Sequence, residues 1–127
     1  MKDFKTQAVW QRSHKLTVEI YRATRNFPKE EMYGLTSQIR RAMSSIPTNI
    51  AEGCGRRTNA ELANFLNIAS GSASEVEYEI LLSKEVGYIT DEQYEAWTKE
   101  IREIRSMLSA YITKVVEANK KTDNEKR

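Results

Sequence analysis

Very few side chains in this sequence could carry out acid–base or nucleophilic chemistry. The only histidine is His14, and the only cysteine is Cys54, which stands between two glycines and close to Arg56 and Arg57. Neighbouring arginines stabilise a thiolate and are therefore expected to lower the pKa of Cys54. Nucleophilic catalysis also needs a base beside the thiol, and no histidine lies near Cys54 in the sequence. We therefore expect no enzymatic activity.

Several glutamates raise the alternative of a di-iron site within a helical protein. The candidate carboxylates are Glu52, Glu75, Glu77 and Glu79. A di-iron bundle needs a Glu-x-x-His motif on each of two helices, and the sequence contains no such motif. It also shows neither a glycine-rich phosphate-binding loop nor clustered metal ligands. The sequence gives no reason to expect a cofactor or a metal.

Basic side chains are the stronger candidates for a functional surface. Arginine and lysine can neutralise phosphates without reading any base, and arginine also forms forked ion pairs with carboxylates. Arg12, Lys15, Arg22 and Arg25 fall near one side of the first predicted helix, and Glu19 interrupts them. The candidate nucleic-acid-binding set is Arg12, Lys15, Arg22, Arg40, Arg41, Arg56 and Arg57.

The alternative is a solvated face whose arginines pair with acidic residues of the third and fourth helices. For Arg40 and Arg41 we prefer this structural interpretation, because a distinctive position within a helix often serves an interface. Arg40 and Arg41 therefore belong to the candidate set while their contacts remain open.

Charge is divided unevenly along the chain. Residues 1–57 carry 11 Lys and Arg against 5 Asp and Glu, whereas residues 58–127 carry 9 against 13. The whole chain has a formal net charge of only +2, which does not by itself indicate a nucleic-acid partner. The asymmetry is typical of a polyanion-binding surface, of head-to-tail pairing with a second copy, or of two halves that attract each other within one bundle.

Length and composition favour one intracellular domain. A chain of 127 residues fits a single domain, and one cysteine cannot form an intrachain disulfide but fits a reducing cytoplasm. The N-terminal residues lack the apolar run of a signal peptide. No stretch approaches the roughly 18 uncharged apolar residues of a membrane span. We expect a cytoplasmic protein without a membrane partner.

Apolar residues recur at helical spacing in four segments, without strand-like alternation. The first predicted helix runs from about Thr6 to Asn26 and ends before Pro28. Its expected buried seam is Val9, Ser13, Leu16, Ile20, Ala23 and Phe27.

The second helix is expected to begin near Glu30, since Glu30 and Glu31 would favour the positive end of its dipole. Gly53 or Gly55 is expected to end it in a left-handed conformation. Pro47 lies inside this segment, but the apolar stripe continues through Ile50.

Because the stripe continues, we predict a kink at Pro47 rather than two separate helices. A polar side chain just after the proline, Asn49, is expected to bond carbonyl groups that the proline leaves free. Asn49 is therefore predicted to be structural.

Capping boxes mark the starts of the third and fourth helices, at Thr58 with Glu61 and at Thr90 with Gln93. Gly87 is expected to cap the end of the third helix. The fourth helix has the most regular pattern and is expected to end near residue 119. Its seam is Tyr94, Trp97, Ile101, Ile104, Leu108, Tyr111 and Val115.

Short loops make consecutive helices antiparallel neighbours. The predicted fold is therefore all-α, an antiparallel up-down-up-down four-helix bundle over residues 1–118, followed by a disordered polar tail over residues 119–127. Aromatic rings can stack on bases, but in a bundle we expect core or interface positions for Trp10, Tyr33, Trp97 and Tyr111.

Some apolar residues fall outside the main seam of the third helix. Phe65, Ile68 and Leu82 form a second stripe, which favours contact with another subunit. Gly71 lies within a run of small residues, where close approach of another helix would offset its poor helix propensity. We therefore predict a homo-oligomer.

Longer motifs connect the chain to a known family. The stretch SIPTNIAEG occupies residues 45–53, after LTSQIRRA at 35–42 and before FLNIASGS at 65–72. With VWQ at 9–11 and FP at 27–28, these motifs resemble the four-helix bundle family encoded within intervening sequences of bacterial 23S rRNA genes. The resemblance extends from about Phe4 to Val116.

The resemblance implies a four-helix bundle and, as in some members, a homopentamer. A related branch is the accessory protein of diversity-generating retroelements, which binds a reverse transcriptase and nucleic acid. For the intervening-sequence branch no molecular function is established. The partners to consider are a second copy of the chain, RNA or DNA, and another protein.

Two functional hypotheses follow from these observations. The first is a non-enzymatic homo-oligomeric binding protein that contacts structured RNA or other nucleic acid through a basic surface. The alternative is a protein–protein interaction scaffold or adaptor that does not bind nucleic acid. The two hypotheses differ in one measurable property: only the first predicts binding to nucleic acid that weakens steeply as the salt concentration rises.

Overall fold

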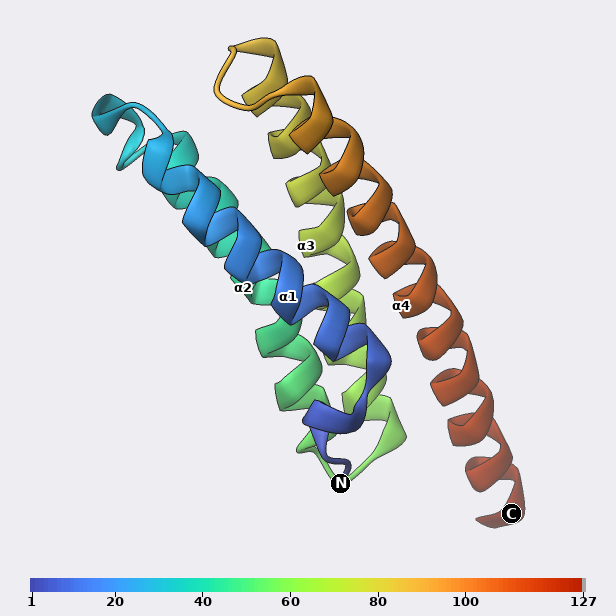
Figure 1. Cartoon of the computed structure of the whole chain (residues 1–127). Helices are drawn as coiled ribbons and strands as arrows, with labels where there is room; N and C mark the ends of the chain where they lie inside the picture. The colour runs from blue at the N-terminus through green and yellow to red at the C-terminus, as the bar shows by residue number, and fades with distance from the viewer. Residues whose placement is uncertain (127) are drawn as a thin grey trace.

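The computed structural model describes residues 1–126, within which four helices form an antiparallel bundle without strands (Figure 1). The helices are α1 (Ala8–Ala23), α2 (Leu35–Cys54), α3 (Asn59–Glu85) and α4 (Asp91–Lys126). Three short 3-10 helices, η1 (Phe4–Thr6), η2 (Thr24–Asn26) and η3 (Lys29–Glu31), lie before α1 and between α1 and α2. The predicted four-helix bundle is confirmed.

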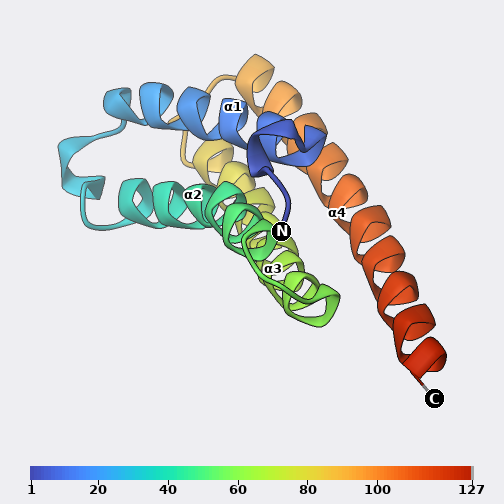
Figure 2. The same cartoon turned by 90° about the horizontal axis from the view of Figure 1, so that it is seen from below.

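The helices pack in the order in which they follow one another along the chain. α2 contacts α1 on one side and α3 on the other, and α3 contacts α4. The C-terminal part of α4 diverges from the other helices in both views (Figures 1 and 2). No helix within residues 1–126 combines the length and the apolar character that crossing a membrane requires.

The predicted seams form the core. On α1, Ala23 is half-buried and the remaining seam residues are buried. On α4, Tyr94 and Tyr111 are half-buried and the other seam residues are buried. Fully buried large side chains come from all four helices and include Leu16, Ile20, Ile39, Met43, Ile46, Leu66, Ile80, Ile101, Ile104 and Leu108.

Both predicted capping boxes are confirmed. The Glu61 amide donates to Thr58 Oγ1 at 3.2 Å, and the Gln93 amide donates to Thr90 Oγ1 at 3.0 Å. Gln93 Oε1 also accepts from the Thr90 amide at 2.9 Å, which completes the reciprocal pattern. At the end of α3, Gly87 has a φ of +83°, as expected for a glycine cap.

The predicted start of α2 is wrong, whereas its predicted end at residues 53–55 is confirmed, because the helix ends at Cys54. The helix begins at Leu35, not near Glu30, because Gly34 has a ψ of −118° that no helix accommodates. Glu31 still caps the helix from outside, since its Oε1 accepts from the Leu35 amide at 3.2 Å. At the other end Gly55 has a φ of −82°, so neither Gly55 nor Gly53 takes the expected left-handed conformation.

Pro47 interrupts the hydrogen bonding of α2 but not the helix itself, which continues to Cys54. A proline at this position removes the bond to the carbonyl of Met43, four residues earlier. Asn49 Nδ2 donates to the carbonyl of Ser45 at 2.8 Å and to Ser45 Oγ at 2.9 Å. Asn49 is thus structural, as predicted, but the carbonyl it bonds lies beyond the one that the proline leaves free.

The glycines of α2 and α3 do not have the roles that the sequence indicates. A Cβ on Gly53 would lie 2.9 Å from Leu62 Cδ1 and 3.0 Å from Phe65 Cβ, so Gly53 lets α2 approach α3 closely. A Cβ on Gly71 would meet no atom within 4 Å. The expected close approach of a helix at Gly71 is therefore wrong within one subunit.

Helix α4 is longer than predicted. It continues to Lys126, whereas we expected a polar tail without structure from residue 119. Once a helix exists, each further residue adds a hydrogen bond without a new nucleation cost, so polar residues can extend it. Thr122 Oγ1 adds a bond to the Ala118 carbonyl at 3.0 Å. Arg127 lies outside the described residues.

One carboxylate lies in the core. Glu79 of α3 is only 3% exposed, and its Oε1 has no hydrogen-bond partner within residues 1–126. Burial, followed by the charge of Glu75, raises the pKa of Glu79 from 4.5 to about 7. The carboxylate form is therefore disfavoured in the folded protein.

The two contrasting glycines predict opposite effects of an added methyl group. Gly53→Ala should lower the free energy of unfolding by about 1–3 kcal/mol, because the new Cβ overlaps Phe65 and Leu62. Gly71→Ala should raise it by up to about 1 kcal/mol through helix propensity alone. Urea unfolding of the two variants checks this, and equal effects would contradict the described packing.

Glu79 predicts that stability depends on pH. Because its pKa is higher in the folded than in the unfolded chain, stability should fall as pH rises from about 4.5 through about 7 and then level off. Glu79→Gln should therefore stabilise the protein at pH 8, by up to about 3 kcal/mol, and much less at pH 4.5.

Unfolding of wild type and variant at both pH values tests this expectation. Glu85→Gln removes an exposed carboxylate from the same helix and serves as the matched control. An unchanged pH dependence in Glu79→Gln would show that the carboxylate is not disfavoured in the core.

Candidate functional site

The seven predicted cations do not form one patch. Arg41 is 13 residues before Cys54, the last residue of α2, so about 20 Å of helix separates Arg41 from the loop that carries Arg56 and Arg57. Arg40 and Arg41 also point in directions that differ by about 100°. The candidate set is therefore spread over separate parts of the surface, and each cation has to be assigned by its own contacts.

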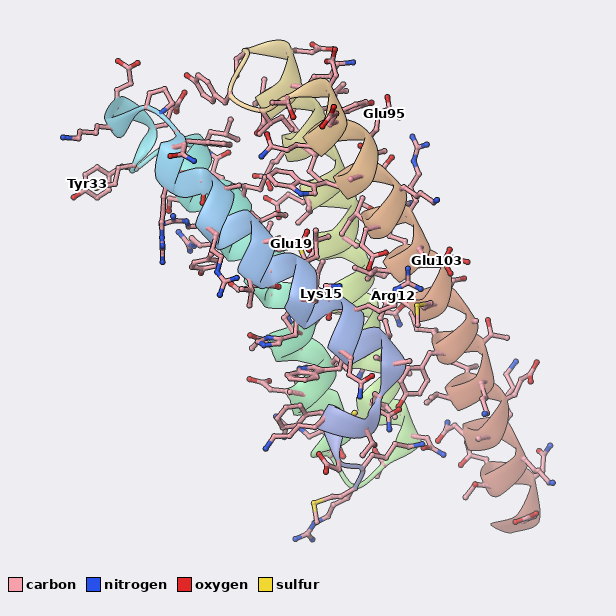
Figure 3. All side chains as sticks on the ribbon, in the orientation of Figure 1. Arg12, Lys15, Glu19, Tyr33, Glu95 and Glu103 are labelled. Carbon is pink, nitrogen blue, oxygen red and sulfur yellow. The ribbon has the colours of Figure 1, made fainter. Side chains whose placement is uncertain are left out.

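Arg12 is the cation that links the basic half of the chain to the acidic half. Its Nη2 lies 2.5 Å from Glu100 Oε1, and its Nε donates to Glu100 Oε2 at 3.2 Å. Glu103 Oε1 lies 3.8 Å from Nη1, and the bond to Glu100 raises the pKa of Arg12. Figure 3 shows Arg12 between α1 and α4, on the side of Glu103. Arg12 therefore holds α1 against α4, and its place in the candidate set stays a prediction.

Arg40 joins α2 to the end of α1. Its Nε donates to Thr24 Oγ1 at 2.8 Å, and its Nη2 donates to the carbonyl of Tyr21 at 3.0 Å. The guanidinium also lies 5.0 Å from the centre of the Tyr21 ring. Since helix ends leave carbonyls without partners, Arg40 closes the C-terminus of α1. This supports the structural interpretation, with bonds to a carbonyl and a hydroxyl instead of acids.

The remaining arginines of α2 and its loop have different surroundings. Arg56 lies over the ring of Phe65, with 4.9 Å between its guanidinium carbon and the ring centre. Arg57 is exposed in the loop after α2. Arg41 is exposed beside a polar groove between α2 and α3 that Gln38 and Glu75 also line. None of these three arginines forms an ion pair within the described residues.

A more compact group of cations lies on the outer side of α1. Lys15 and Arg22 are seven residues apart and share one face of α1, and Arg25 follows in η2. Lys29 continues the group in η3, and all four side chains are exposed. Within residues 1–126 none of the four forms an ion pair, although Glu19 lies near Lys15 on α1 (Figure 3). We call Lys15, Arg22, Arg25 and Lys29 the α1 basic face.

The opposite edge of the bundle carries exposed acids. Glu92, Glu95 and Glu103 are exposed on α4, and Figure 3 shows Glu95 and Glu103 on its outer side. The surface therefore has a cationic edge at α1 and an anionic edge at α4.

The arginines of α4 are held within this acidic half. Arg102 Nε lies 3.0 Å from Glu77 Oε2, and Arg105 Nη1 lies 2.5 Å from Glu77 Oε1. Burial alone would raise the pKa of Glu77, but the bonds from the two arginines outweigh burial and lower it. Neither arginine is therefore available to the α1 basic face.

Cys54 differs from its prediction. It is the last residue of α2 and is buried rather than placed in a loop. Burial raises the pKa of its thiol, with smaller opposing effects from Tyr111 and Lys2. The expected lowering by Arg56 and Arg57 is therefore wrong. Burial and the charge of Cys54 also raise the pKa of Tyr111 to about 12.

The other groups that could carry chemistry are dispersed. His14 is exposed and stacks against Trp10 with 4.9 Å between ring centres. Within residues 1–126 no three His, Cys, Asp or Glu side chains are placed to hold a metal ion.

The predicted aromatic residues divide between core and surface. Trp97 is buried, and Trp10 and Tyr111 are half-buried, as expected. Tyr33 is 93% exposed, so it does not lie in the core, and its place in an interface stays a prediction. Its position between Pro28 and Gly34, in a short segment without a seam, is the sequence signal of a loop.

The apolar residues outside the seam of α3 also divide. Leu82 packs against the core, whereas Ile68 remains 52% exposed. Tyr78, which the sequence did not single out, is 61% exposed on the same helix.

Comparison with known proteins identifies the family. The family model of the 23S rRNA-intervening sequence protein matches residues 5–110. A similar solved structure is a protein of unknown function from the S23 ribosomal protein family of Bacteroides thetaiotaomicron VPI-5482, with 33% identity and a TM-score of 0.75. The match covers 83% of this chain and 98% of the relative. No curated protein sequence matches the chain significantly. The chain belongs to the 23S rRNA-intervening sequence protein family.

Proposed function

We propose that this protein is a non-enzymatic binding protein that contacts structured RNA through the α1 basic face. The proposal rests on the observation that most basic side chains of residues 1–57 form no ion pair with an acidic side chain within residues 1–126 of the same subunit. Residues 1–57 have an excess of positive charge, yet within the described residues Arg12 is the one cation of this half that forms an ion pair. Ion pairs between the two halves of the bundle therefore neutralise little of the positive charge of residues 1–57.

Phosphate binding explains such a surface in physical terms. Cations that neutralise phosphates release condensed counterions, which favours association and makes it depend on salt. The exposed residues Lys15, Arg22, Arg25 and Lys29 need no base-specific geometry for such contacts. The solved relative has no known function, so the proposal rests on the charge and exposure of this chain.

The proposal predicts that removing charge from the α1 basic face weakens binding. Arg22→Gln combined with Arg25→Gln should bind a structured RNA stem-loop more weakly than wild type at low salt. The slope of log affinity against log salt should become shallower by roughly 1.4 to 1.8, the value for two lost phosphate contacts. Fluorescence anisotropy at several salt concentrations measures both quantities.

A matched control variant distinguishes the effect of charge on the α1 basic face from the effect of the net charge of the whole protein. Lys99→Gln combined with Lys114→Gln removes the same charge from exposed positions of α4 and should leave the slope unchanged. Equal losses in both double variants would show that the α1 basic face is not the site. Absence of wild-type binding at low salt would reject RNA binding and favour an interaction scaffold.

Self-association is a second proposal, supported by the outer side of α3. Ile68, Tyr78 and Leu81 are exposed there, and Gly71 offers open space beside them. Exposed apolar side chains on a helix favour contact with another subunit. The homo-oligomer is thus proposed on the basis of this surface.

A charge placed on that side should reduce the mass in solution. Ile68→Lys should lower the mass seen by light scattering at micromolar concentration, because a contact would bury the charge without a partner. Ser106→Lys on the exposed side of α4 is the control and should retain the wild-type mass. A wild-type monomer under these conditions would rule out the proposed association.

A further inference from the structure

The connection between α1 and α2 presents an aromatic ring to solvent. Tyr33 is 93% exposed, and its neighbour Met32 is 55% exposed. Figure 3 shows Tyr33 pointing away from the bundle at the end where α1 and α2 are joined. Its ring is therefore accessible to a partner.

The loop that carries Tyr33 is held firmly on both sides. Phe27 packs against Tyr88, with ring centres 5.3 Å apart, before the loop begins. Glu31 Oε2 accepts from the Tyr88 hydroxyl at 2.8 Å, and Glu31 Oε1 accepts from the Leu35 amide at 3.2 Å. These contacts fix the backbone around Tyr33, so ordering the loop costs little when a ligand binds.

Exposed cations precede this ring along the chain. Arg22, Arg25 and Lys29 of the α1 basic face come 11, 8 and 4 residues before Tyr33, and all three are exposed. Glu30 is an exposed acid within the loop, whereas Glu31 is half-buried and bonded to Tyr88. The local charge therefore favours a phosphate backbone that reaches the exposed ring.

We propose that Tyr33 stacks on an unpaired base while the α1 basic face holds the adjoining phosphates. A base inside a duplex already stacks on its neighbours, so only a loop or a single-stranded end can offer a free face to a side chain. The ligand is therefore RNA with an unpaired segment, not a continuous duplex. This inference rests on the proposed function and specifies the substrate class of the same site.

The test compares two RNAs of equal length and charge, a hairpin with an unpaired loop and a fully paired duplex, each titrated at the same series of salt concentrations. Wild type should prefer the hairpin. Tyr33→Ala should lose about 5- to 150-fold affinity for the hairpin, the range expected for one stacked base. It should change duplex affinity little and keep the salt slope. Tyr33→Phe should behave like wild type, because the ring is retained.

Several outcomes would overturn the inference while leaving the proposed function intact. These are equal affinity of wild type for the two RNAs, or an equal loss for both RNAs in Tyr33→Ala. A lower solution mass of Tyr33→Ala with unchanged hairpin preference would assign the ring to a protein contact instead. Failure of the proposed function is distinct, since wild type would then bind neither RNA in a salt-dependent way.

The Glu30→Gln variant tests independently whether the RNA phosphate backbone passes the loop that carries Tyr33. Removal of the exposed carboxylate beside the ring should tighten hairpin binding by reducing repulsion. Unchanged or weaker binding would mean that the RNA backbone does not pass the loop.

Discussion

The close approach of α2 to α3 is the constraint on which the rest of the structure depends. It requires Gly53, because any side chain there would overlap Leu62 and Phe65. The hydrogen bond of 2.9 Å between Ser45 Oγ and Ser72 Oγ continues the contact farther along the two helices. With α2 fixed against α3, its other side is available to α1, and Arg40 completes that second contact at Tyr21 and Thr24.

This packing determines which cations remain exposed. Arg40 donates a hydrogen bond to Thr24 at the end of α1, and Arg12 forms an ion pair with Glu100 of α4. Both arginines therefore hold helices together. Lys15 and Arg22 of α1 and Arg25 of η2 are exposed and form no ion pair within the described residues, although Lys15 lines a hollow that Glu100 of α4 also lines. The cationic surface is thus what remains after the bundle has satisfied its own contacts. The same reasoning applies to Tyr33, which lies beyond the anchored residues Phe27 and Glu31.

The sequence predicts the bundle well, because apolar spacing and capping boxes are local signals that packing does not override. Thr58 and Thr90 cap their helices as predicted, and the seams of α1 and α4 form the core. The roles of glycines could not be predicted in the same way. Gly53 and Gly71 are alike in sequence terms, and only the position of the neighbouring helix makes one close-packed and the other open.

The candidate site could be predicted only in part, because a cation in a sequence shows neither its partners nor its exposure. Arg12 and Arg22 lie on one helix, and a difference in facing direction makes one an ion-pair partner and the other exposed. Cys54 shows the same limit, since burial raises the pKa of its thiol although Arg56 and Arg57 are near it in the sequence. Lys29 was not singled out in the sequence, and Tyr33 was weighed for base stacking but assigned to the core or an interface, because the loop has no motif that indicates binding.

The most direct test of the central claim is a lysine acetylation footprint of the wild-type protein with and without stem-loop RNA, read by mass spectrometry. Lys15 and Lys29 lie on the α1 basic face, whereas Lys99 and Lys114 are exposed on α4. If phosphates cover the α1 basic face, RNA should slow acetylation of Lys15 and Lys29 and leave Lys99 and Lys114 unchanged. Protection of the α4 lysines without protection of Lys15 and Lys29 would contradict the account.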